Sequence, residues 1–181
     1  ILPGMIIPDQ IIHKFIMKNS TNNLIQKTNY TFGFSGFSEV VYYRTYSRTK
    51  ENGEKEKWPD TVIRVVEGVL SIRKNWLINN NKIWNEEYWQ NIAHNMSLCM
   101  MKMQFLPAGR GLWACGTDFM YKRSASALNN CTFVSTGYGN DDFLSATTFI
   151  MDSLMCGCGV GFDTKWRGII FPPGCKKCRN E

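Results

Sequence analysis

Two stretches of the chain repeat apolar residues at steps of three and four, the spacing typical of an amphipathic helix. The first has apolar residues at Val62, Val65, Val66, Val69, Leu70, Ile72 and Trp76. The second has them at Trp84, Tyr88, Trp89, Ile92, Met96, Cys99, Met100 and Met103. We expect Asp60, after Pro59, to be the N-cap of the first helix and Pro107 to end the second. The pattern therefore predicts two helices before residue 106.

The N-terminal part of the chain has weaker patterns. A short helix from Asp9 is plausible, because apolar residues cluster on both sides of it. Ser, Thr and Asn dominate residues 18–23, which favours a loop or a helix cap. Residues 32–48 are rich in glycine, aromatic and β-branched residues, which favours extended structure or a loop.

The second half of the chain alternates between glycine-rich segments and regular patterns. Residues 106–118 contain three glycines and are expected to form a loop. Residues 128–136 alternate like a strand, and Asn140 or Asp141 is expected to cap a third helix. The apolar stripe of that helix is Phe143, Thr147, Ile150, Met151 and Leu154, followed by glycines at 157, 159 and 161 and another short apolar piece. This order predicts an α/β unit, and no internal repeat is visible.

Composition narrows the class of protein. With 181 residues, 44% apolar and 13% aromatic, the chain can bury a core as one domain or a piece of one, which excludes wholesale disorder. No apolar run is long enough to span a bilayer, and no signal-peptide pattern is present. The first residue is Ile1 rather than Met, so we expect a fragment. The seven cysteines are expected to be reduced, and the expected location is the cytoplasm.

The net charge of +6 is spread along the chain. No run of five or more Lys or Arg residues occurs, so we expect an ordinary solvated surface that also favours polyanionic substrates rather than a dedicated nucleic-acid face. The candidates for anion contact are Arg44, Arg48, Arg64 and Arg110. Arg110 is the strongest because it lies in the glycine-rich segment, where backbone amides can also face a ligand.

Cys131 follows Asn129 and Asn130 in the predicted strand. An arbitrary strand cysteine is most often a buried, small apolar residue. The two neighbouring amides must find hydrogen-bond partners, which favours a polar pocket with a redox-capable thiol.

The remaining cysteines and both histidines give weaker signals. Cys156 and Cys158 form a C-x-C pair with no histidine nearby, which is poor zinc geometry, whereas the alternate glycines around them favour close approach of the backbone to a ligand. Cys175 and Cys178 are half of a four-thiolate zinc site. His13 and His94 lie at apolar stripes, so we assign no catalytic role to either.

Five motifs, in this order and at this spacing, are similar to the N-terminal part of the adenosylcobalamin-dependent ribonucleoside-triphosphate reductases. They are VVYYRTYSR (40–48), ENGEKEKWPDTVIRVVEG (51–68), FLPAGRGLWACGT (105–117), ALNNCTFVST (127–136) and MDSLMCGCGVGFDTK (151–165). The resemblance covers about residues 32–165 and implies an α/β fold, with N-terminal helices leading into the first elements of a ten-stranded α/β barrel. It divides the chain into a mainly helical region (1–104), the first part of the barrel (105–165) and a divergent tail (166–181).

The resemblance also implies roles for individual residues. Cys131 matches one of two thiols that become a disulfide while the ribose 2′-carbon of a ribonucleoside triphosphate is reduced. The residues implied to border the substrate are Pro107, Ala108, Gly109, Arg110, Ser126, Asn129, Asn130, Cys158, Gly159 and Gly161. Adenosylcobalamin is the implied cofactor of the complete enzyme. A thioredoxin-type reductant and a deoxynucleotide effector are its implied partners, with no membrane or direct nucleic-acid partner.

The chain also departs from the family. The radical cysteine, the partner thiol and the C-terminal thiol pair of the family lie beyond position 181, so we expect this chain to be inactive alone. The run WRGIIFPPGCKKCRNE (166–181) does not follow the family pattern. Two alternative functions remain, a small zinc or redox module built on Cys175 and Cys178, and a basic nucleic-acid-binding domain. Bound zinc would favour the first, and salt-dependent affinity for nucleic acid without nucleotide competition the second.

Overall fold

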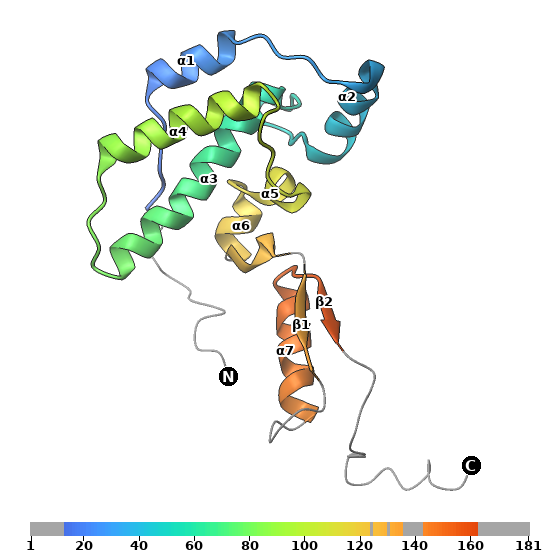
Figure 1. Cartoon of the computed structure of the whole chain (residues 1–181). Helices are drawn as coiled ribbons and strands as arrows, with labels where there is room; N and C mark the ends of the chain where they lie inside the picture. Colours follow the sequence, from blue (N-terminus) through green and yellow to red (C-terminus); the bar gives the residue numbers. More distant parts are fainter. Residues whose placement is uncertain (1–12, 124, 130, 136–142, 163–181) are drawn as a thin grey trace, which may run out of the picture.

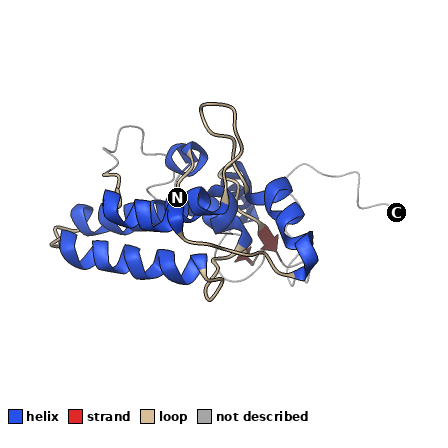
Figure 2. Cartoon of the chain, turned by 90° about the horizontal axis from the view of Figure 1, so that it is seen from above, coloured by secondary structure: helices blue, strands red, loops and turns tan. Residues whose placement is uncertain are grey.

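The computed structural model describes residues 13–123, 125–129, 131–135 and 143–162. A group of helices forms the N-terminal part, and a small unit of one helix and two strands follows it along the chain (Figure 1). Seen from above, helices dominate the molecule and the strands are short (Figure 2).

The two helices expected from the apolar pattern form an antiparallel pair at the centre of the N-terminal part. They are α3 (Trp58–Asn79) and α4 (Glu86–Met101). Val62, Val65 and Val66 of α3 are fully buried in the core. Asp60 is not the N-cap of α3, as predicted, because the helix begins two residues earlier; its carboxylate instead accepts the Lys57 backbone N–H at 2.9 Å from within the first turn.

The residues that α4 buries overlap the predicted stripe only in part, at Met100. Its buried positions are Gln90, Ala93, Ser97, Met100 and Met101, whereas Tyr88 of the predicted stripe is exposed. The large residues Trp89, Ile92 and Met96 pack at the edge of the core. Small side chains at the centre of a helix face let the backbones approach closely, which a search for large apolar residues does not detect.

Residues 13–17 form an extended segment that lies along α3 and precedes α1 (Asn19–Lys27). Its alternate backbone amides donate to side chains on successive turns of α3: His13 to Asn75 Oδ1, Phe15 to Ser71 Oγ and Met17 to Glu67 Oε1, each at 2.9 Å. The side chains of Phe15 and Met17 are buried, and that of Ile16 points to solvent. We refer to residues 13–17 as the strap and to Glu67, Ser71 and Asn75 as its ladder.

One prediction for the N-terminal part is partly right and another is wrong. Of the loop or helix cap expected over residues 18–23, the structure shows the cap: Lys18 is the N-cap of α1, and residues 19–23 begin that helix, which is held by burial of Thr21 and Ile25. Residues 32–48 are mostly helical rather than extended, with η1 (Phe34–Gly36), α2 (Phe37–Val41) and the π-helix η2 (Tyr42–Tyr46). Burial of Tyr42, whose ring packs against those of Phe32 and Trp58, outweighs the local strand preference of this segment. The helix expected from Asp9 begins outside the described residues.

The glycine-rich residues 106–118 are not a simple loop. They contain α5 (Gly109–Ala114) and the first residue of α6 (Asp118–Arg123). The Arg64 side chain fixes this segment, because it donates to the backbone oxygens of Leu112 and Cys115 while it pairs with Glu56 at 2.8 Å. Arg64 therefore has a structural role rather than the anion-binding role considered for it.

The α/β unit consists of β1 (Thr132–Val134), α7 (Phe143–Met155) and β2 (Val160–Phe162), after the 3-10 turn η3 (Ala125–Leu128). The two strands are parallel, with Thr132 opposite Val160 and Val134 opposite Phe162. The strand predicted over residues 128–136 is thus shorter, because η3 occupies its beginning. The expected cap of α7 at Asn140 or Asp141 lies outside the described residues. The observed fold is helical with a small parallel sheet, and a ten-stranded barrel is not seen in the described residues.

Candidate functional site

Three segments predicted to border a substrate meet where the helical part joins the α/β unit. Arg110, in the first turn of α5, donates from Nη1 to the backbone oxygen of Gly157 at 2.8 Å. Gly157 follows α7 and leads into β2. This hydrogen bond therefore ties the segment containing Pro107, Ala108 and Gly109 to the segment containing Cys158, Gly159 and Gly161.

The backbone oxygen of Ser126 joins the third segment to the same place. It accepts the Cys158 thiol at 2.9 Å and the Asn129 backbone N–H at 2.9 Å. Burial, together with the neighbouring Cys156, raises the pKa of the Cys158 thiol, although Arg110 opposes this effect. Cys158 is thus a neutral donor that holds the η3 turn against the start of β2.

Cys131 is exposed and lies directly before β1. The next residue, Thr132, donates its backbone N–H to the Gly159 oxygen at 2.8 Å. Continuing the strand register back by one residue sets Cys131 opposite Gly159. The thiol is accessible as predicted, but it precedes the strand instead of lying within it. That it faces a pocket lined by residues 157–161 stays a prediction.

Comparison with known proteins gives this arrangement a context. A model of the ribonucleotide reductase alpha domain matches residues 17–117, more than half of the chain. An adenosylcobalamin-dependent ribonucleoside-triphosphate reductase of Euglena gracilis is 43% identical over 145 residues, which are 79% of this chain and 20% of that protein. The chain belongs to the ribonucleotide reductase family.

Two further matches agree with this assignment. A probable adenosylcobalamin-dependent ribonucleoside-triphosphate reductase of Dictyostelium discoideum is 39% identical over 166 residues, 91% of this chain and 22% of that protein. The crystal structure of a B-12 dependent (class II) ribonucleotide reductase superposes with a TM-score of 0.67 at 26% identity, covering 82% of this chain and 23% of that one. The chain thus spans about a fifth of the length of its reductase relatives.

The structure adds two residues to the candidate site. The guanidinium groups of Arg48 and Arg110 lie 5.4 and 5.7 Å from the ring centre of Trp113, within the range of cation–π attraction. Trp113 also packs edge-on against Phe119. The sequence analysis considered Arg48 only as a possible anion contact and gave Trp113 no role. Arg110 and Trp113 are three residues apart, about one helical turn, and this R-x-x-W spacing is the sequence pattern that could have indicated their contact.

One of the alternate glycines has a conformational explanation. Gly157 has φ +85°, and the N–H groups of Gly157 and Cys158 bond back to the oxygens of Leu154 and Ser153. This is the Schellman ending of α7, which favours glycine. A Cβ at Gly157 would also approach Phe119 to 3.1 Å. The helix ending, rather than a ligand, explains this glycine, whereas a Cβ at Gly161 would make only an ordinary contact with Phe133.

The remaining candidates among the described residues do not join this site. Cys115 is fully buried, and burial raises the pKa of its thiol to about 11. His94 lies in α4 beside Thr21, and His13 lies in the strap. Arg44 is exposed, and Asn130, Cys175 and Cys178 lie outside the described residues. In the part of the chain that the structure describes, no three metal-ligating side chains are grouped, and no helix is long and apolar enough to cross a membrane.

Proposed function

We propose that this chain forms the N-terminal part of an adenosylcobalamin-dependent reductase that converts ribonucleoside triphosphates to deoxyribonucleoside triphosphates. In this proposal residues 1–104 are the helical lead-in and residues 105–165 begin a ten-stranded barrel. The convergence of residues 107–110, residues 126–129 with Cys131, and residues 157–161 on one place, through the Arg110, Ser126 and Thr132 hydrogen bonds, is the observation that carries it.

Cys131 is proposed as one of two reducing thiols. After a thiyl radical elsewhere in the enzyme removes the ribose 3′-hydrogen, the 2′-hydroxyl leaves as water. Cys131 and a second cysteine, which the resemblance places beyond position 181, supply two electrons and two protons and become a disulfide. One proton leaves with the water, the other becomes the new hydrogen on C2′, and the 3′-hydrogen returns to the ribose as the thiyl radical re-forms. A thioredoxin-type protein reduces that disulfide by thiol–disulfide exchange. The exposure of Cys131 supports this role because both the substrate and a reductant need access to its sulfur.

The neighbouring groups are proposed to hold the nucleotide. Ala108 and Gly109 are exposed, and Arg110 is fixed by Gly157 and Trp113, so the charged group is held in place before a phosphate arrives. The Asn129 side chain is exposed, which leaves its amide accessible to a ribose hydroxyl. A deoxynucleotide effector is proposed as a further ligand of the complete enzyme.

Adenosylcobalamin is proposed as the cofactor of the complete enzyme, where it supplies the radical-generating chemistry. The described residues around Cys131 do not by themselves fit a cobalt cofactor. Neither His13 nor His94 lies at this site, so no imidazole is present there to bind cobalt. We therefore assign no described residue to the cofactor.

The test is a Cys131→Ser change in a reductase that contains this chain followed by the rest of the catalytic domain. Serine keeps the volume of cysteine but cannot form a disulfide, so dithiol-driven formation of deoxynucleotide should fall to at most one turnover per enzyme. Product is measured by chromatography in the presence of adenosylcobalamin and excess dithiol.

Cys99→Ser is the matched control, because Cys99 lies in α4, a helix that contributes no residue to the candidate site. This variant should keep multiple turnovers and lose only stability. Multiple turnovers by the Cys131→Ser enzyme would show that Cys131 is not the reductant.

A further inference from the structure

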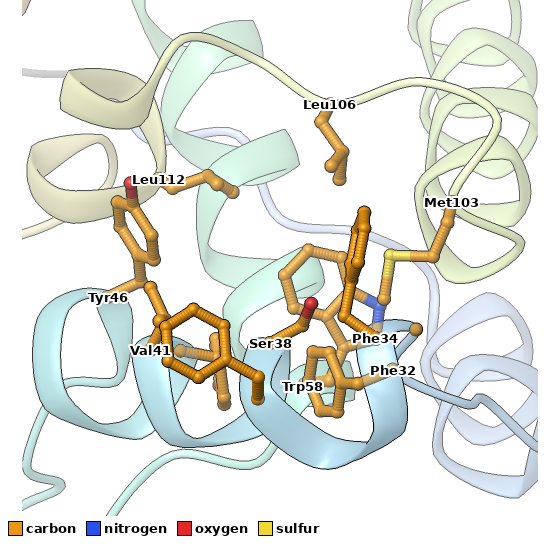
Figure 3. Close-up of a pocket in the computed structure, with 12 residues that line it drawn as sticks. Phe32, Phe34, Ser38, Val41, Tyr46, Trp58, Met103, Leu106 and Leu112 are labelled. Atoms are coloured by element: carbon orange, nitrogen blue, oxygen red, sulfur yellow. The ribbon is translucent and has the colours of Figure 1, made fainter.

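The fold brings Arg48 to the candidate site from a distant part of the sequence. Arg48 follows η2, and the end of η2 packs against the start of α5, where a Cβ at Gly109 would lie 3.1 Å from the Tyr46 hydroxyl oxygen. Figure 3 shows this hydroxyl pointing toward α5. Arg48 and Arg110 therefore both reach Trp113, with their guanidinium carbons 5.4 and 5.7 Å from its ring centre.

The half-buried Arg48 guanidinium forms no ion pair with a carboxylate among the described residues. Its Nε donates to the Tyr46 backbone oxygen at 3.2 Å, and its Nη2 donates to that of Thr45. Both acceptors are uncharged, and Nη1 has no acceptor in the described part of the chain. The carboxylate of Glu56 accepts the Arg48 backbone N–H but pairs with the side chain of Arg64, at 2.8 Å. The charge of Arg48 is thus left for another anion.

Positive charge gathers around the Trp113 ring. Arg48 and Arg110 contact the ring, and burial together with the neighbouring Arg64 lowers the pKa of Arg48, which Glu56 offsets only in part. Like charges held this close repel one another, and an anion that contacts both removes the repulsion. The ring holds both cations in place before such an anion arrives. This arrangement favours a ligand with several negative charges over one with a single charge.

We propose that Arg48 is a specificity-determining residue that binds the terminal phosphate of the ribonucleoside triphosphate, while Arg110 binds the phosphates nearer the ribose. The assignment rests on the proposed function, in which the ribose lies at Cys131. Arg110 is tied to Gly157, where the chain leads into β2, whereas Arg48 is tied to η2 in the helical part. A nucleotide chain that starts at Cys131 therefore meets Arg110 first and Arg48 next. A diphosphate lacks the group that Arg48 takes, so Arg48 favours triphosphates.

The test uses the complete reductase of the preceding experiment and compares CTP with CDP, which differ only in the terminal phosphate. In the Arg48→Gln variant the KM for CTP should rise about tenfold, the factor that one charge-assisted contact supplies. Its kcat should stay unchanged, because the contact is lost equally from the bound substrate and the transition state. The KM for CDP should not change. Arg48→Lys, which keeps the charge but not the fork of donors, should retain part of the preference for CTP.

Arg44→Gln is the matched control, because Arg44 belongs to η2 but is exposed and has no part in the candidate site. It should leave both KM values as they are. An unchanged KM for CTP in an Arg48→Gln enzyme that still forms deoxynucleotide would overturn the role of Arg48 and leave the proposed function intact.

A second measurement needs neither catalysis nor a folded variant. In the unchanged 181-residue chain, inorganic tripolyphosphate should shift the side-chain Nε–H resonances of Arg48 and Arg110 in NMR spectra, and both shifts should saturate at the same concentration. If the complete enzyme forms no deoxynucleotide, the proposed function fails, and this measurement alone decides whether the two residues bind one polyphosphate. An unmoved Arg48 resonance, or shifts that saturate at different concentrations, would show that they do not.

Discussion

At the residue scale, the half-buried carboxyl group of Glu67 accepts a hydrogen bond from the Met17 backbone N–H. Burial raises the pKa of Glu67, and the bond from the Met17 N–H only partly opposes this. Because the pKa is higher in the folded than in the unfolded state, this group favours folding most at acidic pH. That contribution is lost as the pH rises through the folded pKa, where the buried carboxyl must ionise.

Glu67→Gln should therefore stabilise the protein at neutral pH. The amide oxygen still accepts the Met17 N–H, and no charge is buried. We expect the free energy of unfolding at pH 7 to rise by roughly 1 kcal/mol or less, and the difference to shrink near pH 4. Urea denaturation at both pH values measures it, with the exposed Glu51→Gln as control. A loss of stability in Glu67→Gln at pH 7 would contradict the argument.

Some residues of the candidate site could be predicted from the sequence and others could not, for physical reasons. Arg110 and Cys131 were found because a charge in a glycine-rich segment and a thiol beside amides are local signals. The contact between Arg48 and Trp113 was missed because the two residues are 65 positions apart in the sequence. Whether the Trp58 N–H finds an acceptor is decided by all the side chains packed around it, and a pattern in one sequence does not reveal these.

At the element scale, Gly68 of α3 lies directly against the turn after α5. A Cβ at Gly68 would lie 2.4 Å from the Gly116 nitrogen and 2.8 Å from Cys115 Sγ. Gly→Ala inside a helix normally stabilises by about 1 kcal/mol. At Gly68 the overlap reverses the sign, and we expect a loss of about 1–3 kcal/mol in the free energy of unfolding.

Chemical denaturation of Gly68→Ala measures this loss. Gly33→Ala is the control, because no atom lies within 4 Å of a Cβ at Gly33 and its φ of −74° suits alanine. The control should change the free energy of unfolding by less than about 0.5 kcal/mol, as surface substitutions usually do. Equal effects of the two variants would show that the α3 contact with Gly116 is looser than described.

Elements were predicted well where they are long and repeat apolar residues several times, as in α3, α4 and α7. Helix α1 was missed because its Asn, Ser and Thr residues favour turns, and contacts distant in sequence decide its structure. Residues 34–46 were missed because aromatic and β-branched residues favour strands, whereas the aromatic cluster around Tyr42 holds them helical.

At the scale of the whole molecule, the small α/β unit leaves several large apolar side chains exposed. Its exposed apolar side chains are Phe133, Met151, Leu154, Met155 and Phe162, each at least half exposed. A two-stranded sheet of three residues per strand is too small to be stable by itself. The amides of β1 and β2 should therefore open locally at low cost.

Hydrogen exchange followed by mass spectrometry tests this difference in stability. In the isolated 181-residue chain, amides of residues 132–134 and 160–162 should exchange at least tenfold faster than those at the centres of α3 and α4. Comparable protection of both parts would show that the α/β unit is stable without further cover.

The strap and its ladder combine two periodic structures of different pitch. Acceptors four residues apart on α3 rise by about 6.0 Å, whereas alternate amides of an extended chain are about 6.6 Å apart. If one amide is aligned with its acceptor, the next amide is displaced from its acceptor by about 0.6 Å. An amide three acceptors away is displaced by nearly 2 Å, which is too far for a hydrogen bond. Three successive hydrogen bonds are therefore close to the largest number that an extended segment can make with side chains four residues apart on a straight helix. This mismatch fixes the position of the strap along α3, since a slip of one rung would leave a buried amide without an acceptor.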